Sequence, residues 1–156
     1  MAVTAHLRSF LDHHHVRFEP VPHSRTFEMA RAARAAHVSG KNVAKGVMVK
    51  SDGDYVLAVM PASRKLDMDS LGRFLGTKVT LASEAEAARR FPDCEFGAIP
   101  ALGEAYGLDT VIDDDMLGDK DVFFEGGDHR TLVAVDAAGW RRLIGNAPHA
   151  RFTTDA

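Results

Sequence analysis

Two apolar runs on either side of a short turn, between Asn42 and Pro61, constrain the fold more than any other stretch of the chain. The runs read NVAKGVMVK and YVLAVMP, and the turn between them reads SDGD. Runs rich in β-branched residues around a glycine-containing turn are typical of a β-hairpin. Because the runs are largely apolar at successive positions, they need burial on both faces. We therefore predict two paired central strands, over 43–50 and 55–60.

Lys45 interrupts the first apolar run with a positive charge. An ammonium group on an apolar strand is costly to bury unless it reaches the rim of the fold or has a partner in a cleft. Most charged side chains are solvated, so one interpretation is a lysine that faces water at the start of a strand. The other interpretation is a functional lysine in a cleft. The sequence by itself leaves both open.

The rest of the chain mixes short helices and short strands without a regular repeat. We expect helices over 4–14, 27–36, 66–75, 83–90 and 136–143, further strands over 16–19, 78–81, 110–113, 121–124 and 131–135, and a loose tail after Gly145. No sustained strand-helix alternation requires a doubly wound parallel sheet. The order therefore predicts an α+β fold with a mixed, mostly antiparallel central sheet flanked by helices. A chain of 156 residues fits one domain, over 1–156.

The composition is that of an ordinary globular protein, with 46% hydrophobic and 26% charged residues. Cys94 is the single cysteine, which excludes an internal disulfide. No apolar run approaches about 18 residues and no signal-peptide pattern follows Met1, so we expect a cytoplasmic protein with no membrane partner. Cys94 is a candidate catalytic thiol, but its acidic neighbours would raise its pKa, which favours a cysteine without a chemical role.

Charge is unevenly distributed along the chain, although the net charge is only −3. Residues 25–50 carry six basic side chains and one acidic side chain, a net +5, whereas residues 93–128 carry eleven acidic side chains and one lysine, a net −10. The basic segment predicts a local contact with a polyanion, without indiscriminate binding to DNA or RNA. Arg31, Arg34 and Lys41 are the candidate residues. The alternative is a solvated helix face.

Two polar clusters invite a metal hypothesis that their spacing does not favour. His13, His14 and His15 are consecutive, so they cannot share one face of a helix. Asp113, Asp114 and Asp115 lie in one loop, whereas hard cations need ligands that converge from several elements, so a solvated turn is the better interpretation. We expect neither a metal nor another cofactor.

Two glycine-containing loops are the remaining candidates for a site. Residues 96–103 form an uncharged loop with two glycines and a proline, which indicates either a pocket wall approached by a ligand or a buried turn under the sheet. Residues 125–129 read EGGDH and place His129 at a tight backbone corner between two strands. Backbone amides at this corner are expected to be free to point at a substrate oxygen. A plain hairpin turn explains the glycines as well.

Several of these stretches, taken in order, resemble the YbaK and prolyl-tRNA synthetase-associated family of aminoacyl-tRNA deacylases. The resemblance covers 23–143 and rests on VAKGV at 43–47, with the family's strand lysine, on YVLAVMP at 55–61, on GAIP at 97–100 followed by Gly103, and on GGDH at 126–129. The chain departs from the family pattern at Ala101 and Leu102, where many relatives carry a second proline and an aromatic residue, and at Asp128, an added acid. These departures bear on which acyl group is accepted.

The resemblance implies hydrolysis of the ester that joins a wrong amino acid to the terminal adenosine of tRNA, of the tRNA-Pro type or with a similar small amino acid. It implies the acceptor end of aminoacyl-tRNA as partner and a transient association with an aminoacyl-tRNA synthetase. It implies catalytic roles for Lys45, Gly127 and His129, and a substrate-binding role for the following residues: His23, Gly97, Ala98, Ile99, Pro100, Gly126 and Asp128.

An ester is already activated, so such a site mainly has to hold the acyl group, place a water molecule and stabilise the oxyanion. The absence of a nucleophile elbow or a Cys-His arrangement in the sequence agrees with this. A second hypothesis stays open, in which the same fold is a non-catalytic module that binds a tRNA end or a small molecule. A third, a protein-interaction domain, has only the acidic residues 113–121 in its favour.

Overall fold

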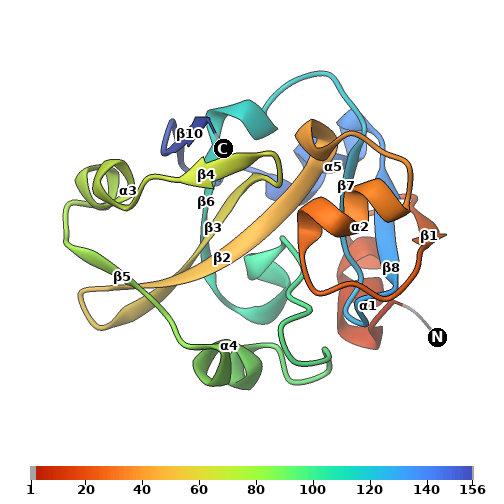
Figure 1. Cartoon of the computed structure of the whole chain (residues 1–156), viewed down its shortest axis with the longest axis horizontal. Coiled ribbons are helices and arrows are strands. Elements are labelled where there is room, and N and C mark those ends of the chain that lie inside the picture. Colours follow the sequence, from red (N-terminus) through yellow and green to blue (C-terminus); the bar gives the residue numbers. More distant parts are fainter. Residues whose placement is uncertain (1–2, 156) are drawn as a thin grey trace.

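A mixed β-sheet forms the centre of the computed structural model, which describes residues 3–155. Its strands follow the order β1-β8-β7-β2-β3-β6-β9, and β5 pairs with β2 outside this path (Figure 1). The β2–β7, β3–β6 and β6–β9 pairs are parallel and the others are antiparallel. The strands are β1 (Glu19–Pro22), β2 (Val43–Ser51), β3 (Asp54–Pro61), β5 (Val79–Leu81), β6 (Asp109–Asp113), β7 (Val122–Glu125), β8 (Thr131–Val135) and β9 (His149–Ala150). A separate pair joins β4 (Arg64–Leu66) to β10 (Thr153–Asp155).

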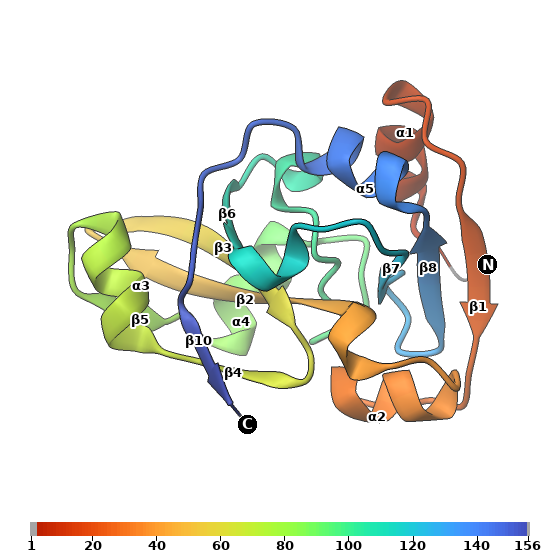
Figure 2. The same cartoon turned by 90° about the horizontal axis from the view of Figure 1, so that it is seen from above.

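Helices cover both faces of the sheet, in agreement with the prediction of a central sheet flanked by helices. They are α1 (Ala5–His13), α2 (Met29–Ala35), α3 (Met68–Leu75), α4 (Glu84–Arg90) and α5 (Ala137–Ile144), with the 3-10 turns η1 (Gly40–Asn42), η2 (Gly103–Tyr106) and η3 (Asp114–Met116). α1, α4 and α5 share the largest core with β2 and β3. α2 and α3 pack on the opposite face, so that α1 and α5 lie on one side of the sheet and α2 on the other (Figure 2). None of the helices within residues 3–155 is long and apolar enough to cross a bilayer.

The predicted central hairpin is confirmed. β2 and β3 pair antiparallel from Ala44 opposite Pro61 to Ser51 opposite Asp54. The two residues between them, Asp52 and Gly53, both have positive φ, at 51° and 85°, which is the geometry of a two-residue hairpin turn that matches strand twist. Leu57 and Val59 of β3 enter one core and Val56, Ala58 and Met60 enter the other, so this strand is buried on both faces.

Local capping chemistry sets where the helices begin. Thr4 accepts a hydrogen bond from the amide of Leu7 at the start of α1. Ser83 and Glu86, three residues apart, form a reciprocal capping box at the start of α4. Asp136 caps α5 through the amide of Gly139, at 2.7 Å. These contacts span three residues at most, which is why the sequence alone predicts them.

The strand predicted over 16–19 is wrong in its position. β1 spans Glu19–Pro22 and includes two prolines, Pro20 and Pro22. β1 is an edge strand that pairs only with β8, and an edge strand tolerates a proline whose nitrogen faces away from its partner. Val16 is instead a buried core residue, and its amide donates to the carbonyl of Leu11 at the end of α1.

The loose tail predicted after Gly145 is also wrong. Residues 149–150 and 153–155 form β9 and β10, neither of which was predicted, and Phe152 between them is fully buried against the face that carries α3. The backbone amide of Phe152 donates to Asp113 Oδ1 at 2.9 Å. A single buried aromatic residue and its backbone contact therefore hold the segment, and neither leaves a periodic signal in so short a stretch.

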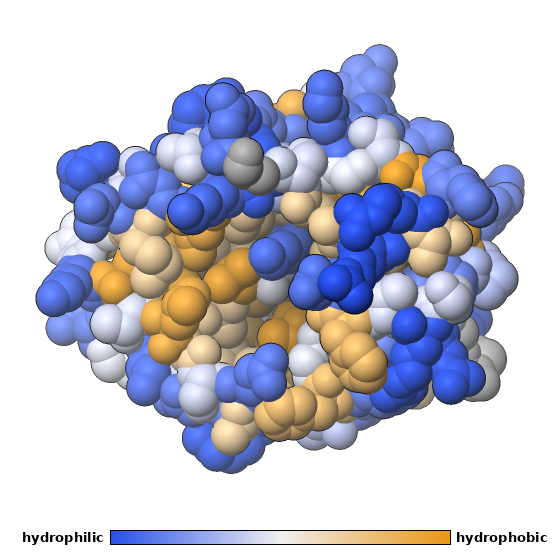
Figure 3. Space-filling view, in the orientation of Figure 1, coloured by the Kyte–Doolittle hydropathy of each residue, from blue (hydrophilic) through white to orange (hydrophobic). Residues whose placement is uncertain are grey.

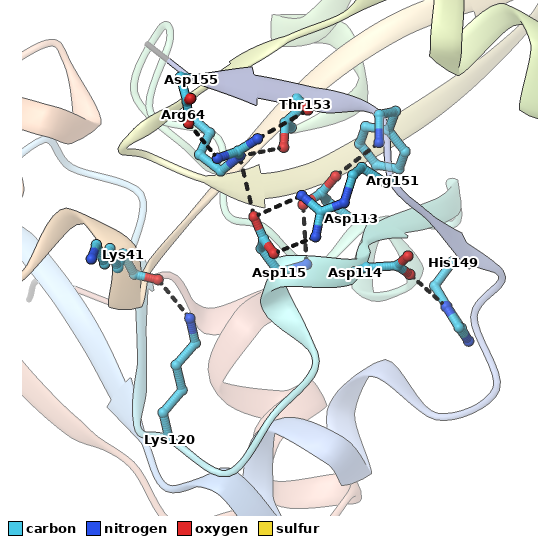
Figure 4. Close-up of polar contacts among 11 residues, drawn as sticks. Lys41, Arg64, Asp113, Asp114, Asp115, Lys120, His149, Arg151, Thr153 and Asp155 are labelled. Atoms are coloured by element: carbon cyan, nitrogen blue, oxygen red, sulfur yellow. Dashed lines mark hydrogen bonds and ion pairs between the residues drawn. The ribbon is translucent and has the colours of Figure 1, made fainter.

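The acidic segment at the end of β6 is part of the same contact, not the solvated turn that was predicted (Figure 4). Asp113 is fully buried, and its Oδ2 accepts the amide of Asp115 at 3.1 Å. Asp115 forms ion pairs with Arg64, at 3.1 Å, and with Arg151, at 2.9 Å. Arg151 lowers the pKa of the Asp115 carboxyl below its usual value. The acidic residues thus anchor β4 and the C-terminal segment.

Replacing Asp113 by alanine tests this anchor. The change leaves the buried amide of Phe152 and the partly buried amide of Asp115 without an acceptor, which costs about 2 kcal/mol of unfolding free energy. We expect the melting temperature to fall by about 4 to 8 °C. Asp114→Ala is the matched control, because Asp114 contacts only the exposed ring of His149 and its loss costs less than about 1 kcal/mol. Equal melting temperatures for the two variants would contradict the anchor.

Candidate functional site

A cavity of about 260 Å³ opens beside the start of β2. Its walls come from five separate stretches of the chain: residues 26–30 before and at the start of α2, β2, the residue that follows β3, the 96–103 loop, and the 125–129 corner. The lining residues are Thr26, Phe27, Glu28, Met29, Ala30, Lys45, Gly46, Ala62, Gly97, Ile99, Glu125 and His129. Figure 3 shows the face of the molecule that carries β2, hollowed in its middle and apolar on much of its floor.

Lys45 lies on β2 and lines this cavity. Its side chain is half-buried, whereas Lys50, five residues along the strand, is exposed and pairs with Glu86 at 3.0 Å. β2 and β7 pair in parallel through Val43 with Phe123 and Ala44 with Phe124. Lys45 and Glu125 occupy the next positions along these two strands, so one ammonium and one carboxylate reach the same cavity. This is the cleft interpretation of Lys45.

Glu125, for which the sequence predicted no role, organises the glycine corner. Its side chain is only 2% exposed. Its Oε2 accepts the backbone amides of Gly127, Asp128 and His129, at 2.8, 3.1 and 3.2 Å. Burial raises the pKa of this carboxyl, and the three amides act in the opposite direction. The expectation that these amides are free to bind a substrate oxygen is therefore wrong, because Glu125 already occupies them.

His129 has a fixed orientation in the cavity wall. Its side chain is 3% exposed, its φ is 61°, and its ring packs against Phe27 at 4.7 Å between centroids. His129 Nε2 lies 2.7 Å from the carbonyl oxygen of Phe96. Because a carbonyl only accepts, Nε2 carries the hydrogen in the neutral ring and Nδ1 keeps its lone pair. His129 can therefore accept a proton or a hydrogen bond at Nδ1.

The apolar loop serves both of the roles considered for it. Gly97 and Ile99 line the cavity, whereas Ala98 and Pro100 are buried beside it and do not. Gly97 has a φ of 81° and a Cβ on it would lie 3.6 Å from Cε1 of His129. The loop therefore forms a pocket wall with alternate residues and a buried turn with the others.

The other predicted substrate residues lie near the cavity without lining it. Gly126 donates its amide to the carbonyl of Thr131. Asp128 accepts the amide of Arg130 at 2.9 Å, so it braces the corner locally. The ring nitrogen Nδ1 of His23 lies 2.6 Å from the carbonyl of Ser24, and its Nε2 is buried without a hydrogen-bond partner within the described residues.

The three predicted polyanion-binding residues lie on or just after α2, whose first residues line the cavity. Arg31, Arg34 and Lys41 are all exposed. Arg31 pairs with Glu28 at 3.5 Å, and both side chains are about two-thirds exposed, so the pair contributes little and leaves the guanidinium accessible. Arg31 and Arg34 therefore lie on the helix whose first residues line the cavity, whereas Lys41 lies after it and lines a separate hollow beside Arg64 and Asp115.

A hydrogen-bonded cluster from distant parts of the chain supports the glycine corner from behind. Tyr106 Oη contacts Thr4 Oγ1 at 3.0 Å and Asp93 Oδ1 at 2.8 Å. The amide of Thr4 donates to the carbonyl of Gly126 at 3.2 Å. Burial is the main cause that raises the pKa of the Cys94 thiol in this cluster to about 12, so the thiol stays protonated and unreactive at neutral pH.

No group of three or more histidine, cysteine, aspartate or glutamate side chains within residues 3–155 is arranged to hold a metal ion. His13 to His15 lie at the end of α1 and in the turn after it, and none of them lines the cavity. The polar side chains that line the cavity are Lys45, the buried Glu125, the exposed Glu28, His129 and Thr26. Thr26 Oγ1 is buried without a hydrogen-bond partner among residues 3–155.

Comparison with solved structures shows the fold. A hypothetical protein shares 20% sequence identity, with a TM-score of 0.82 over 96% of this chain and 99% of the other. A candidate trans-editing enzyme for prolyl-tRNA synthetase shares 22% identity, with a TM-score of 0.79 over 96% of this chain and 95% of the other. A candidate signal transduction protein from Marinobacter aquaeolei shares 19% identity, with a TM-score of 0.76 over 96% of this chain and only 30% of the other.

No curated protein sequence matches the chain. The family model of the aminoacyl-tRNA editing domain matches residues 23–143. This match covers most of the sequence and contains every residue that lines the cavity. The chain therefore belongs to the aminoacyl-tRNA editing domain family.

Proposed function

We propose that the protein hydrolyses the ester bond of mischarged aminoacyl-tRNA in trans, in the cytoplasm, with a small amino acid as the acyl group. The observation that carries the proposal is the convergence of Lys45, Glu125 and His129 on one small cavity in a fold of the editing family. About 260 Å³ is below the usual range for drug-sized ligands, so it suits an acyl group of a few heavy atoms. The rest of the tRNA would remain outside, against the exposed cations of α2.

In this proposal Lys45 anchors the acceptor end and polarises the ester carbonyl, because its ammonium is the cation in the cavity wall. Gly97 and Ile99 bound the acyl group. His129 Nδ1 accepts a hydrogen bond from the attacking water, since Nε2 is committed to the carbonyl of Phe96. A covalent nucleophile is not needed, which agrees with a Cys94 thiol that is protonated and outside the cavity.

The acceptor end of aminoacyl-tRNA is the partner in this proposal, with tRNA-Pro as the first candidate. The structural likeness to a candidate trans-editing enzyme for prolyl-tRNA synthetase motivates that choice and a transient association with a synthetase. The experiment that tests the function is incubation of the purified protein with alanyl-, cysteinyl-, seryl- and threonyl-tRNA. Release of amino acid from at least one of them above the spontaneous rate supports the proposal.

One observation favours the second candidate function, a module that binds the tRNA end without hydrolysis. The amides at the glycine corner are occupied by Glu125, so they do not offer an oxyanion site in this arrangement. A protein that retains each of the four aminoacyl-tRNAs intact, and yet binds them, would be such a module.

The exposed cations on and just after α2 lead to a prediction on salt dependence. Arg31, Arg34 and Lys41 would contact phosphates of the acceptor stem and release counterions, so tRNA affinity should fall steeply with salt. Replacement of each by glutamine should reduce the slope of log affinity against log salt concentration by about one unit. Arg141→Gln is the control, because this exposed arginine lies on α5, on the opposite side of the sheet. An unchanged slope in the triple variant would mean that the basic face is only solvated.

A further inference from the structure

Glu125 is a buried carboxylate with one oxygen saturated and the other open. Its Oε2 accepts three backbone amides, whereas no described residue donates a hydrogen bond to its Oε1. A carboxylate has about four acceptor positions, and Oε1 is not one of the fully buried atoms within residues 3–155 that lack a partner, so it is open to the cavity. The side chain is 98% buried and yet lines the cavity. The open oxygen is therefore available to a hydrogen-bond donor on a molecule bound in the cavity.

Lys45 does not supply that donor. Within residues 3–155, lysine forms one ion pair, between Lys50 and Glu86. The Lys45 ammonium is not within 4.0 Å of any described carboxylate. The cavity thus presents a cation and an anion at neighbouring positions of two adjacent strands, without direct pairing between them. Such an arrangement is complementary to a ligand that carries a cation close to a polarised oxygen.

The aminoacyl end of a tRNA has this pattern, because its α-ammonium group is one carbon away from the ester carbonyl. We infer that Glu125 Oε1 binds the α-ammonium group of the aminoacyl moiety while Lys45 faces the ester carbonyl, and this inference rests on the proposed function. Glu125 is then the residue that restricts the site to acyl groups with a free, charged α-amino group. The backbone amides at Oε2 fix the carboxylate, so its orientation does not depend on a flexible side-chain contact.

The test uses two stable probes of equal size, 3′-L-alanylamino-3′-deoxyadenosine and 3′-L-lactylamino-3′-deoxyadenosine, in which a hydroxyl replaces the ammonium. Binding to the full chain is measured by isothermal titration calorimetry. We expect the alanyl probe to bind about 10 to 100 times more tightly than the lactyl probe, which is the usual worth of a hydrogen bond to a charged group. Equal size removes steric exclusion as an explanation.

Glu125→Gln removes the negative charge of the side chain and keeps its structural role, because the amide oxygen of glutamine can still accept hydrogen bonds from the three backbone amides. We expect this variant to melt close to the wild type and to bind both probes alike. Glu28→Gln is the matched control, since Glu28 is an exposed carboxylate at the same cavity that already pairs with Arg31. This control should keep the preference for the alanyl probe.

The inference is overturned by equal binding of the two probes to the wild type, by binding of neither, or by a preference that persists in Glu125→Gln or disappears in Glu28→Gln. The same measurements distinguish failure of this inference from failure of the proposed function. Preferential binding of the alanyl probe, with no hydrolysis of any aminoacyl-tRNA, would remove the hydrolase and keep the role of Glu125. Hydrolysis without the preference would do the reverse.

Discussion

Lys45→Ala is expected to lower kcat/KM for the preferred aminoacyl-tRNA by a factor of about 100 or more, which corresponds to roughly 3 kcal/mol of transition-state stabilisation. The reason is that the Lys45 ammonium lies in the wall of a small cavity, where its interaction with a polarised carbonyl is stronger than in open water. Its half-buried side chain carries no ion pair with any described residue, so the melting temperature should change by less than about 2 °C. Single-turnover deacylation and thermal melting measure the two effects.

Two further variants test whether activity needs the lysine itself at position 45 or only a positive charge on β2. Lys45→Arg keeps the charge but replaces a compact ammonium by a planar guanidinium, so activity should be impaired as well. Lys50→Ala is the matched control on the same strand, because Lys50 is exposed and pairs with Glu86 outside the cavity. Full activity of Lys45→Ala with an intact circular dichroism spectrum would remove Lys45 from the site.

Gly127→Ala is expected to destabilise the protein by about 3 kcal/mol and to abolish most of the activity. A Cβ on Gly127 would lie 2.4 Å from Cγ2 of Thr4 and 3.4 Å from Sγ of Cys94, and the φ of 118° is strained for any residue with a side chain. The melting temperature should fall by about 6 to 12 °C. Relief of the strain would move the amides that hold Glu125, so the cavity would lose its shape together with its stability.

The steric and the conformational parts of this cost can be measured apart. Thr4→Ser removes the methyl group that meets the new Cβ and keeps the hydroxyl that caps α1, so the double variant should recover part of the loss. Gly76→Ala is the control for backbone strain alone, because its φ is 77° and nothing lies within 4 Å of the added Cβ. If Gly127→Ala costs no more than Gly76→Ala, the corner is not tightly supported.

Features set by near neighbours in the chain could be predicted from the sequence. The β2–β3 hairpin depends on a two-residue turn and on apolar runs beside it, and the capping box of α4 depends on residues three apart. The positions of β1 and β10 could not be predicted, because they are set by partners far along the chain. Glu19 pairs with Ala134, and Thr153 pairs with Leu66. A local pattern carries no information on such partners.

Some residues of the candidate site could likewise be predicted from the sequence, and one could not. Lys45, Gly97 and His129 drew attention because each departs from what its surroundings require: a charge in an apolar strand, a glycine in an uncharged loop, and a histidine after two glycines. Glu125 was missed because an acid at the end of a strand is ordinary in sequence. Only the fold shows that it is 2% exposed and bound to three amides. An acid directly after an apolar strand and before two glycines is the signal that was present.

The pairing of β1 with β8 also limits when the chain can fold during its synthesis on the ribosome. Residues 19–22 emerge early, but their strand partner at 131–134 emerges more than a hundred residues later. The cavity likewise needs residues 26–30 and residues 125–129 together. Non-local pairing of this kind slows folding, since the loop must close before its contacts form. A nascent chain therefore completes the cavity only after residues 125–129 have left the exit tunnel, although its basic segment emerges long before.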